Sequence, residues 1–559
     1  MTDLASSDLL PHRFFARVDS HPDTTYLVQP QSGGQVTEYS NKQVHDEAAK
    51  MASHLQGLNL PAQSKIGIIS KNCAHFFMAE LAIWMAGHVT VALYPTLAAD
   101  TVEYIVDHSE AKLLFIGKLD DAPWAEIQRG LTADVPWIKL PLAPESVDCP
   151  SWDEMTKDAE LATRPTVSAD DEALIIYTSG STGQPKGVLH NFRTISASTK
   201  GLVKMLSINE SDRMLSYLPL AHGMDRWLSE CLSLYAGTTV YFAESLTTFV
   251  QDLGRARPTV FVSVPRLWLK FQLGVFSKMP KSRLDFLLKI PILSGLLKKK
   301  LLAGLGLDSV RFAGSGSAPI PAELLAWYRN LGLELLEGYG MSENFNYSHI
   351  TVPGKGRPGY IGHPYPEVEC KLSDEGEILV KSPGTMVGYY KEPEKTAAAL
   401  TEDGFLKTGD RGEIDSDGRL RITGRVKELF KTSKGKYVAP APIENHINND
   451  ERVELCVVAG NGQKNTHAVI QLAEDLLPKI NNPGVKEEVT AAMERLLDAT
   501  NSKIEEYERL GFVVISKERW TIEGGQLTPT MKIRRGPIED MYAEKLDDWY
   551  SNGSKVIWE

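Results

Sequence analysis

Short apolar runs alternate with longer amphipathic segments in the first part of the chain. Residues 64–70, 88–94, 111–116 and 173–177 are nearly continuous apolar runs, and residues 75–86 have the length and spacing of a helix. Strands that are apolar on both faces and separated by helices are typical of βαβ units. The pattern therefore predicts an α/β fold built on mostly parallel sheets.

The hydrophobic pattern changes after about residue 370. Residues 377–381, 412–415 and 419–423 are short strand-like runs separated by Gly and Asp. Residues 415–418, Asp-Ser-Asp-Gly, favour a hairpin turn, because Gly tolerates the positive φ that a tight turn needs. We therefore expect a β-rich subdomain at the end of the large domain.

A smaller α+β pattern follows. It consists of strands over 453–459 and 512–516 and a helix over 486–503. We predict a large N-terminal domain, residues 1–424, of mixed, mostly parallel sheets wrapped by helices. A small C-terminal α+β domain, residues 425–559, follows.

Composition and charge narrow the function classes. The 559 residues are 42% hydrophobic and 24% charged, which is typical of a folded globular protein. The net charge of −12 makes the chain a poor general binder of polyanions, so we expect no nucleic-acid partner. Any nucleotide or phosphate must therefore be bound by local groups.

The cysteines and the N-terminal residues indicate in which cellular compartment the protein is expected. The five Cys are far apart, odd in number and form no CxxC pair, which argues against a disulfide framework or a zinc ribbon. The first residues lack the cationic and apolar regions of a secretory signal. The most apolar long stretch, 76–94, contains Glu80 and His88 and is interpreted as core. We expect a soluble protein in the reducing cytoplasm.

A glycine-rich segment carries the strongest chemical signal. Residues 177–187, Tyr-Thr-Ser-Gly-Ser-Thr-Gly-Gln-Pro-Lys-Gly, follow an apolar strand and precede a helix predicted from Asn191. Small hydroxyl residues and Gly let backbone N–H groups close around phosphate oxygens. Lys186 would add a point charge for a leaving polyphosphate. The alternative is a plain Ser/Gly surface turn.

This loop differs from the Walker A loop, G-x-x-x-x-G-K-[ST]. Gly180 and Lys186 have its spacing, but Pro185 replaces its second Gly and Gly187 replaces the Ser or Thr that would hold Mg²⁺. The segment therefore predicts a phosphate loop of another kind.

Residues 178–187 resemble the signature loop of the adenylate-forming superfamily, which contains acyl-CoA synthetases, luciferases and peptide-synthetase adenylation domains. The resemblance spans residues from about 40 to about 545. Five further segments resemble motifs of that superfamily in the same order: 218–222 (LPLAH), 338–343 (GYGMSE), 407–410 (KTGD), 424–428 (GRVKE) and 528–534 (TPTMKIR).

Within the superfamily the sequence resembles the long-chain fatty acyl-CoA synthetases most. The segments that carry this are 218–226, 264–268 and 310–320, with a long basic insert before residue 310. The resemblance implies ATP, Mg²⁺ and coenzyme A as cofactor and co-substrates. A carboxylate would attack the α-phosphate of ATP, giving acyl-AMP and pyrophosphate, and a thiol would then displace AMP to give a thioester.

Three alternatives remain open at this point. The substrate could be a medium-chain or aromatic acid, because tunnel depth cannot be read from one sequence. The acceptor could be a carrier protein instead of free coenzyme A. A protein of another class, a nucleotide-binding sensor, would bind ATP without releasing pyrophosphate.

The resemblance implies three catalytic residues. Lys532 would reach the acyl carboxylate and the α-phosphate, His222 would orient the acyl carboxylate, and Lys186 would bind phosphate. By itself Lys532 could be a surface lysine in a basic cluster, and His222 could be a core or loop histidine. The family often has Gly before its lysine, where this chain has Met531.

The nucleotide site is also inferred from the resemblance. Glu343, with Thr178, would bind Mg²⁺, and a hard oxygen ligand suits that ion. Tyr339 would stack on adenine, and Asp410 would accept hydrogen bonds from both ribose hydroxyls. The remaining residues of this predicted site are Ser342 at the α-phosphate, Arg425 near the ribose or phosphate, Ser179, Gly180, Ser181, Thr182, Gly183, Gly316, Ser317, Ala318 and Gly340.

The hinge and the thiol site follow in the same way. The resemblance implies that the small domain rotates about Lys427 between the half-reactions. A basic loop that would hold the phosphates of coenzyme A consists of Lys431, Lys434, Gly435 and Lys436. The alternative for that loop is a solvated charged turn. Trp227 is a candidate wall of the acyl pocket, or plain core.

The basic insert has two interpretations. Residues 281–300 carry six basic residues and one acidic residue among many leucines, and Pro291 and Gly295 should break the segment into two short helices. Such a segment can contact an anionic membrane surface, here the inner face of a membrane. It can also be a helical cap on the large domain. The oligomeric state, monomer or homodimer, stays open.

Overall fold

The computed structural model describes residues 4–131, 134–178, 184–522, 524–528 and 531–559. The chain divides into two compact units. The first unit extends to Cys370 and includes Val380–Lys407, and the second consists of Lys371–Leu379 and Thr408–Glu559. The predicted domain boundary at residues 424–425 stays a prediction.

A seven-stranded sheet organises the first unit, in the order β18-β8-β7-β4-β3-β5-β6. Strands β6, β5, β3, β4 and β7 are parallel, whereas β8 and β18 are antiparallel to their neighbours. The apolar runs predicted as strands are confirmed. The bounds are β3 (Lys65–Ile69), β4 (Val89–Leu93), β5 (Leu113–Ile116), β6 (Trp137–Lys139), β7 (Glu172–Thr178), β8 (Lys186–Asn191) and β18 (Gly388–Tyr389).

Two further sheets belong to the first unit. Their orders are β2-β1-β10-β9 and β11-β12-β13-β14-β15. In the second, β11, β12 and β13 are parallel and β14 and β15 are antiparallel. The bounds are β1 (Thr25–Pro30), β2 (Val36–Ser40), β9 (Arg213–Ser216), β10 (Thr239–Phe242), β11 (Val260–Ser263), β12 (Phe312–Ser315), β13 (Leu335–Tyr339), β14 (His349–Ile350) and β15 (His363–Pro364).

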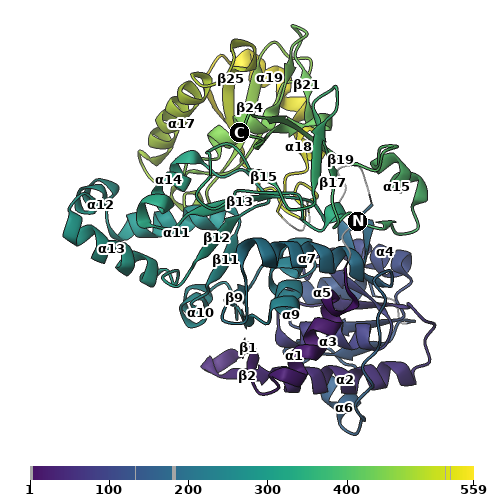
Figure 1. Cartoon of the computed structure of the whole chain (residues 1–559). Coiled ribbons are helices and arrows are strands. Elements are labelled where there is room, and N and C mark those ends of the chain that lie inside the picture. Colours follow the sequence, from purple (N-terminus) through teal and green to yellow (C-terminus); the bar gives the residue numbers. More distant parts are fainter. Residues whose placement is uncertain (1–3, 132–133, 179–183, 523, 529–530) are drawn as a thin grey trace. The chain divides into compact units, whose positions relative to one another are not determined.

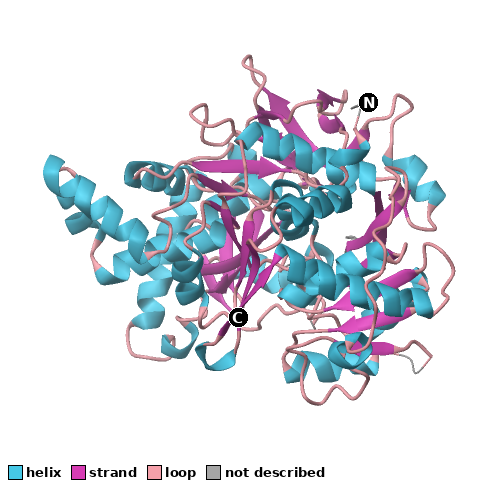
Figure 2. Ribbon diagram, turned by 60° about the horizontal axis from the view of Figure 1, so that its bottom comes forward, coloured by secondary structure: helices cyan, strands magenta, loops and turns pink. Residues whose placement is uncertain are grey.

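Helices pack around these sheets, as Figures 1 and 2 show. Helix α3 (Ala74–Met85) is buried along its whole length, which explains its apolar sequence. The other helices of the first unit are α1 (Leu10–Ser20), α2 (Asn41–Gly57), α4 (Ala99–Ser109), α5 (Asp121–Arg129), α6 (Trp152–Thr156), α7 (Phe192–Leu206), α8 (Gly223–Asp225), α9 (Leu232–Ala236), α10 (Phe249–Ala256), α11 (Pro265–Lys278), α14 (Ala322–Leu331) and α15 (Pro393–Ala399).

The basic insert forms two helices, α12 (Lys281–Leu288) and α13 (Pro291–Gly304). The predicted break at Pro291 is confirmed, because proline is favoured at the first position of a helix and cannot continue the preceding one. The predicted break at Gly295 is wrong. Gly295 lies inside α13, where glycine lowers helix stability by only about 1 kcal/mol.

The second unit contains a mixed four-stranded sheet, β23-β24-β25-β26, packed on helices. The strand over 453–459 is confirmed, and the predicted helix and last strand agree within about two residues. The bounds are β23 (Val453–Ala459), β24 (Thr466–Leu472), β25 (Leu510–Ile515), β26 (Val556–Trp558), α16 (Pro440–Ile447), α17 (Val485–Asn501), α18 (Arg535–Tyr542) and α19 (Leu546–Asn552).

Most of another sheet, β16-β17-β19-β20, also belongs to the second unit. The predicted Asp-Ser-Asp-Gly hairpin turn joins β19 to β20, with Gly418 at φ 80°. A short hairpin, β21-β22, follows. The bounds are β16 (Glu369–Leu372), β17 (Glu377–Lys381), β19 (Leu406–Ile414), β20 (Leu420–Arg425), β21 (Phe430–Lys431) and β22 (Tyr437–Val438).

Candidate active site

The glycine-rich loop joins two antiparallel strands. Thr178 ends β7 and lies opposite Lys186, which begins β8. Helix α7 starts where predicted, with Asn191 accepting from the backbone N–H of Thr194 as N-cap. Strand β8 lies between the loop and this helix and pairs with β7 on one side and β18 on the other. The predicted phosphate ligands Ser179, Gly180, Ser181, Thr182 and Gly183 lie outside the described residues.

Two predicted site residues meet at a side chain that the sequence did not indicate. The Tyr389 hydroxyl donates to Glu343 Oε1 at 2.8 Å. Lys186 Nζ lies 4.8 Å from the centre of the Tyr389 ring, within the range of a cation–π contact. Burial and the neighbouring Glu343 raise the pKa of Tyr389, so the phenol keeps its proton and acts as a donor.

Backbone contacts fix the short turn that carries Glu343. The Met386 N–H donates to the Glu343 carbonyl at 2.8 Å. His190, on β8, lies 2.8 Å through Nε2 from the Ser342 carbonyl, so this nitrogen carries a proton and donates. Burial lowers the pKa of His190 to about 4, which keeps the ring neutral at pH 7. Strand β8 therefore holds both Lys186 and the turn of Ser342 and Glu343.

The predicted acyl-orienting histidine lies at the start of α8. His222 Nδ1 accepts from the Met224 N–H at 3.1 Å, so in the neutral ring Nε2 is the protonated nitrogen. The Met224 sulfur accepts from Ser317 Oγ at 3.7 Å. The segment with His222 is thereby joined to the turn that carries Gly316, Ser317 and Ala318.

The adenine motif lies beside that turn. Strands β12 and β13 are parallel with Ser315 opposite Glu337. Gly316 follows the carboxyl end of β12, and Tyr339 is the last residue of β13. A side chain at Gly340 would place its Cβ 2.4 Å from the Asn346 carbonyl oxygen, so this position requires Gly. Ligands of parallel α/β sheets bind at such carboxyl ends. Gly316, Tyr339 and Gly340 therefore lie at one edge of this sheet.

The predicted ribose residues pair with each other in the second unit. Asp410, on β19, lies opposite Arg425, on β20, and Arg425 Nε is 3.2 Å from Asp410 Oδ1. Asp410 is buried and Arg425 is exposed. The Thr408 hydroxyl accepts from the Asp410 N–H at 3.1 Å and fixes the backbone at the carboxylate.

The other predicted residues of the second unit are exposed. The Thr528 N–H donates to the Lys532 carbonyl at 2.8 Å, and Lys532 is exposed. Met531 precedes it with φ 61°, a conformation that favours Gly, which explains why Gly is suited to this position. Lys427 lies in a 3₁₀ turn that follows β20. Of the predicted coenzyme A residues, Lys431 ends β21, and Lys434, Gly435 and Lys436 lie in the turn between β21 and β22.

Trp227 is buried in an aromatic cluster. Its ring packs edge-on against Tyr347 and Tyr365, which stack with centroids 4.4 Å apart. This agrees with the core interpretation, and a role in an acyl pocket stays a prediction.

A buried charge network surrounds the π-helical segment Arg226–Cys231, and the sequence did not indicate it. Arg226 pairs with Glu80, and its Nε lies 3.6 Å from Glu230 Oε2. Arg226 Nε also donates to the Leu220 carbonyl at 3.0 Å, two residues before His222. Burial, and then the charge of Glu80, raise the pKa of Glu230 well above its ordinary value. The network therefore fixes the backbone at the predicted acyl-orienting residue.

The donor set fits Mg²⁺ bound mainly by substrate. No group of three or more His, Cys, Asp or Glu that could hold a metal occurs in the described ranges. Glu343 offers one hard carboxylate, and the Tyr389 hydrogen bond uses only part of its acceptor capacity. Mg²⁺ is commonly bound by one or two carboxylates together with phosphates and waters.

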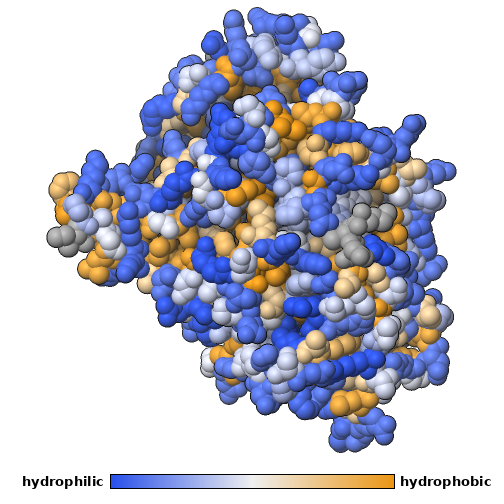
Figure 3. Space-filling view, viewed as in Figure 1, coloured by the Kyte–Doolittle hydropathy of each residue, from blue (hydrophilic) through white to orange (hydrophobic). Residues whose placement is uncertain are grey.

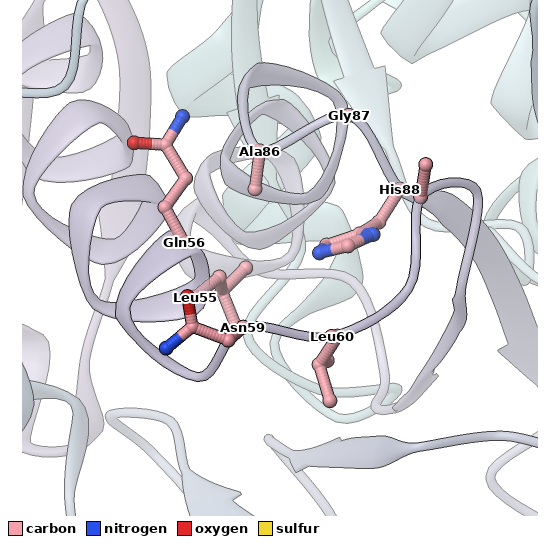
Figure 4. A pocket seen from close by; sticks show the side chains of 8 residues that line it. Leu55, Gln56, Asn59, Leu60, Ala86, Gly87 and His88 are labelled. Carbon is pink, nitrogen blue, oxygen red and sulfur yellow. The ribbon is translucent and has the colours of Figure 1, made fainter.

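A pocket of about 380 Å³ lies elsewhere in the first unit (Figure 4). It is lined by residues that precede β3 and β4, among them Leu60, Gly87 and His88. This is the amino edge of the parallel sheet, opposite the edge where its ligands usually bind. None of its lining residues belongs to the predicted site.

Family models match both parts of the chain. Residues 14–390 match the model described as AMP-binding enzyme, and residues 428–554 match the AMP-binding enzyme C-terminal domain. The chain belongs to the AMP-binding enzyme family. The predicted membership in the adenylate-forming superfamily is thereby confirmed.

Individual AMP-binding enzymes resemble the chain over most of its length. Long-chain-fatty-acid–CoA ligase 1 of Cavia porcellus is 30% identical over 92% of this chain and 82% of its own length. The adenylation domain of a carboxylate reductase from Mycobacterium chelonae superposes with a TM-score of 0.79 at 20% identity, covering 97% and 91% of the two chains. A benzoate CoA ligase from Burkholderia xenovorans has a TM-score of 0.75 at 21% identity, covering 95% and 99%. These structures show the same fold and confirm the predicted fold class.

Proposed function

We propose that this AMP-binding enzyme is an AMP-forming long-chain fatty acid–CoA ligase. It would convert a fatty acid, ATP and coenzyme A to acyl-CoA, AMP and pyrophosphate through an acyl-AMP intermediate. The observation that carries the proposal is the meeting of Lys186 and Glu343 at Tyr389, beside the glycine-rich loop. The likeness to a long-chain ligase over 92% of the chain supports the substrate class.

The first half-reaction brings one anion onto another, so the residues must offset accumulating negative charge. Lys186 would bind the phosphates that leave as pyrophosphate. When bound at Glu343, Mg²⁺ would neutralise phosphate charge. His222 would donate from Nε2 to the acyl carboxylate, because its Nδ1 accepts from Met224. Lys532 would stabilise charge at the carboxylate and the α-phosphate.

The second half-reaction needs different groups. The exposed lysines 431, 434 and 436 surround a single turn and would bind coenzyme A phosphates. Rotation of the small domain about Lys427 would withdraw Lys532 and admit the thiol. One domain would thus serve both half-reactions in sequence.

The test is pyrophosphate release with ATP, Mg²⁺ and acids from C2 to C20 plus benzoate, with and without coenzyme A. We expect the highest rate at C12–C18, with thioester formed. The highest rate with short or aromatic acids would contradict the proposed long-chain substrate but would still support the two-step mechanism. Pyrophosphate without thioester would indicate a carrier-protein acceptor, and ATP binding without pyrophosphate would favour a nucleotide sensor.

We also propose that helices α12 and α13 contact an anionic membrane surface, which would deliver a membrane-partitioned fatty acid. The two helices project from the first unit in Figure 1, and Figure 3 shows apolar side chains on them between polar ones. Phe286 is 65% exposed and Leu296 is 72% exposed. Lys299 and Lys300 are exposed as well. No helix in the described part of the chain is long and apolar enough to cross a bilayer.

Vesicle flotation tests this contact. We expect binding to vesicles that contain phosphatidylglycerol and weaker binding to pure phosphatidylcholine. Phe286→Ser with Leu296→Ser, or neutralisation of Lys298–Lys300, should reduce binding at least fivefold. The control is Leu246→Ser, which removes another exposed leucine of the first unit. Absent binding, or binding unchanged by both sets of variants, would contradict the proposal.

A further inference from the structure

Tyr389 contacts the two oppositely charged residues of the candidate site at once. Its hydroxyl donates to Glu343 Oε1 at 2.8 Å, and its ring lies 4.8 Å from Lys186 Nζ. Among the described residues no ion pair joins Lys186 to Glu343, although both contact the Tyr389 side chain. The phenol therefore bonds to the carboxylate through its hydroxyl and presents its ring to the ammonium.

The backbone holds the Tyr389 side chain in this place. Tyr389 lies opposite Val188 in the β18–β8 pair, and the Tyr390 N–H donates to the Gly187 carbonyl at 2.7 Å. The Tyr389 N–H donates to Thr396 Oγ1 at 2.8 Å, which ties β18 to α15. The ring thus approaches Lys186 from a strand that is hydrogen-bonded to the lysine's own strand.

The same segment also holds Glu343. The Met386 N–H, three residues before Tyr389, donates to the Glu343 carbonyl at 2.8 Å. The distance between the tyrosine and the carboxylate is therefore set by main-chain contacts at both ends. A hydrogen bond to a charged carboxylate is stronger than one between neutral groups, so the hydroxyl can hold the carboxylate in one orientation.

A direct ion pair would have a functional cost. A lysine ammonium bound to Glu343 would neutralise both charges before the substrate arrives. A phenol leaves the carboxylate negative and able to bind a cation, and it leaves the ammonium positive and able to bind phosphate. Both properties are needed for a metal-bound polyphosphate.

We propose that Tyr389 is a positioning residue that keeps Glu343 and Lys186 apart and oriented for a metal–nucleotide substrate. The inference rests on the proposed function and adds a residue to it. It acts in acyl-AMP formation only, because the thioester step involves neither Mg²⁺ nor pyrophosphate. Its two contacts are separable by substitution: the hydroxyl serves Glu343, and the ring serves Lys186.

The experiment compares Tyr389→Phe with Tyr389→Leu. The readout is ATP binding by titration calorimetry at several Mg²⁺ concentrations, which needs no catalysis. We expect Tyr389→Phe to raise the Mg²⁺ concentration for half-maximal ATP binding about five- to tenfold, with near-normal affinity at saturating Mg²⁺. Tyr389→Leu should also weaken ATP binding at saturating Mg²⁺, because it removes the ring beside Lys186.

The matched control is Tyr390→Phe. Tyr390 is the next residue of the same segment, and its ring faces Lys65 and Lys391 instead. It should keep the wild-type Mg²⁺ dependence within twofold. Thermal unfolding of each variant checks folding, and if Tyr389→Leu does not fold, Tyr389→Phe decides.

A double-mutant cycle shows whether Tyr389 acts through Glu343. In a Glu343→Gln background, Tyr389→Phe should change the Mg²⁺ dependence no further. An unchanged Mg²⁺ dependence in Tyr389→Phe alone, or an undiminished effect in the Glu343→Gln background, would overturn the inference. Wild-type binding of ATP without pyrophosphate release would instead overturn the proposed function, and the calorimetry would still test Tyr389.

Discussion

Arg425 Nε lies 3.2 Å from Asp410 Oδ1, and the two residues are direct partners in the antiparallel β19–β20 pair. The carboxylate is buried on a fixed backbone, whereas the guanidinium is exposed. The Thr408 hydroxyl accepts from the Asp410 N–H and itself donates to the Ile378 carbonyl. A rigid acceptor is thereby held beside an adaptable donor, which suits a pair of ribose hydroxyls.

The first prediction concerns Asp410→Ala. The carboxylate can accept hydrogen bonds from two hydroxyls, each worth roughly 1.5–3 kcal/mol with a charged acceptor. We expect the Kd for ATP to rise at least tenfold, with fatty-acid binding changed less than threefold. Calorimetry with each ligand checks this, and Glu413→Ala on the same strand is the control. A larger effect on fatty-acid binding would remove Asp410 from the ribose site.

The second prediction concerns Lys532→Ala. Loss of one group that stabilises transition-state charge costs roughly 10²–10³-fold in rate. We expect pyrophosphate release to fall by that factor, while thioester formation from supplied acyl-AMP stays within about threefold of wild type. Lys517→Ala, another exposed lysine of the second unit, should change neither rate. An equal loss of both half-reactions would contradict the division of roles between them.

The third prediction concerns Glu343→Ala. Removing the proposed Mg²⁺ ligand should raise the Mg²⁺ concentration for half-maximal pyrophosphate release at least tenfold. A Mg²⁺ titration of activity at saturating ATP measures this. Glu394→Ala, which removes an exposed carboxylate of α15, should leave the titration unchanged. A wild-type metal profile in Glu343→Ala would exclude Glu343 as a ligand.

The fourth prediction concerns pH and His467. Burial lowers the pKa of His467 from 6.5 to about 4, and its ring stacks on Phe512. Between these pKa values the unfolded chain binds the proton and the native state does not. Stability from this residue is therefore present above pH 6.5 and is lost as the pH falls towards 4, by up to about 1.4 kcal/mol per pH unit.

We expect His467→Asn to lower the Tm at pH 7.5, because packing is lost. The same variant should lose less Tm than wild type between pH 7.5 and pH 5. Scanning calorimetry at both pH values measures this, with His21→Asn, an exposed histidine, as the control. An equal acid-induced loss of Tm in wild type and His467→Asn would show that this histidine does not contribute.

Much of the fold could be predicted from local patterns. The strand over Val453–Ala459 could be predicted because its buried positions form an apolar run. The turn at Gly418 could be predicted because its positive φ favours glycine. Strand β8 could not be predicted, because its extended conformation depends on pairing with the neighbouring strands β7 and β18. Its sequence, Lys-Gly-Val-Leu-His-Asn, has neither clear alternation nor a long apolar run.

Some residues of the candidate site could be predicted from local motifs, and others could not. The loop at Lys186, the turn at Glu343 and the pair Asp410 and Arg425 were all indicated by motifs. Tyr389 was not, because it lies 46 residues from Glu343 in the chain and follows no recognisable spacing. The sequence also provided no indication of the ion pair between Arg226 and Glu80, because the two residues are 146 positions apart in the chain.

The sequence by itself determined several strands of the central and C-terminal sheets, a few helices, the family and the residue types available for phosphate and metal binding, because these depend on short-range periodicity and compact motifs. Only the tertiary structure decided which of those residues touch. Strand pairing placed Tyr389 beside the strand of Lys186. Hydrogen bonds from the Met386 N–H and the His190 ring to two main-chain carbonyls hold the Glu343 turn in the same place. Such contacts depend on which distant segments pair, and no local pattern specifies that choice.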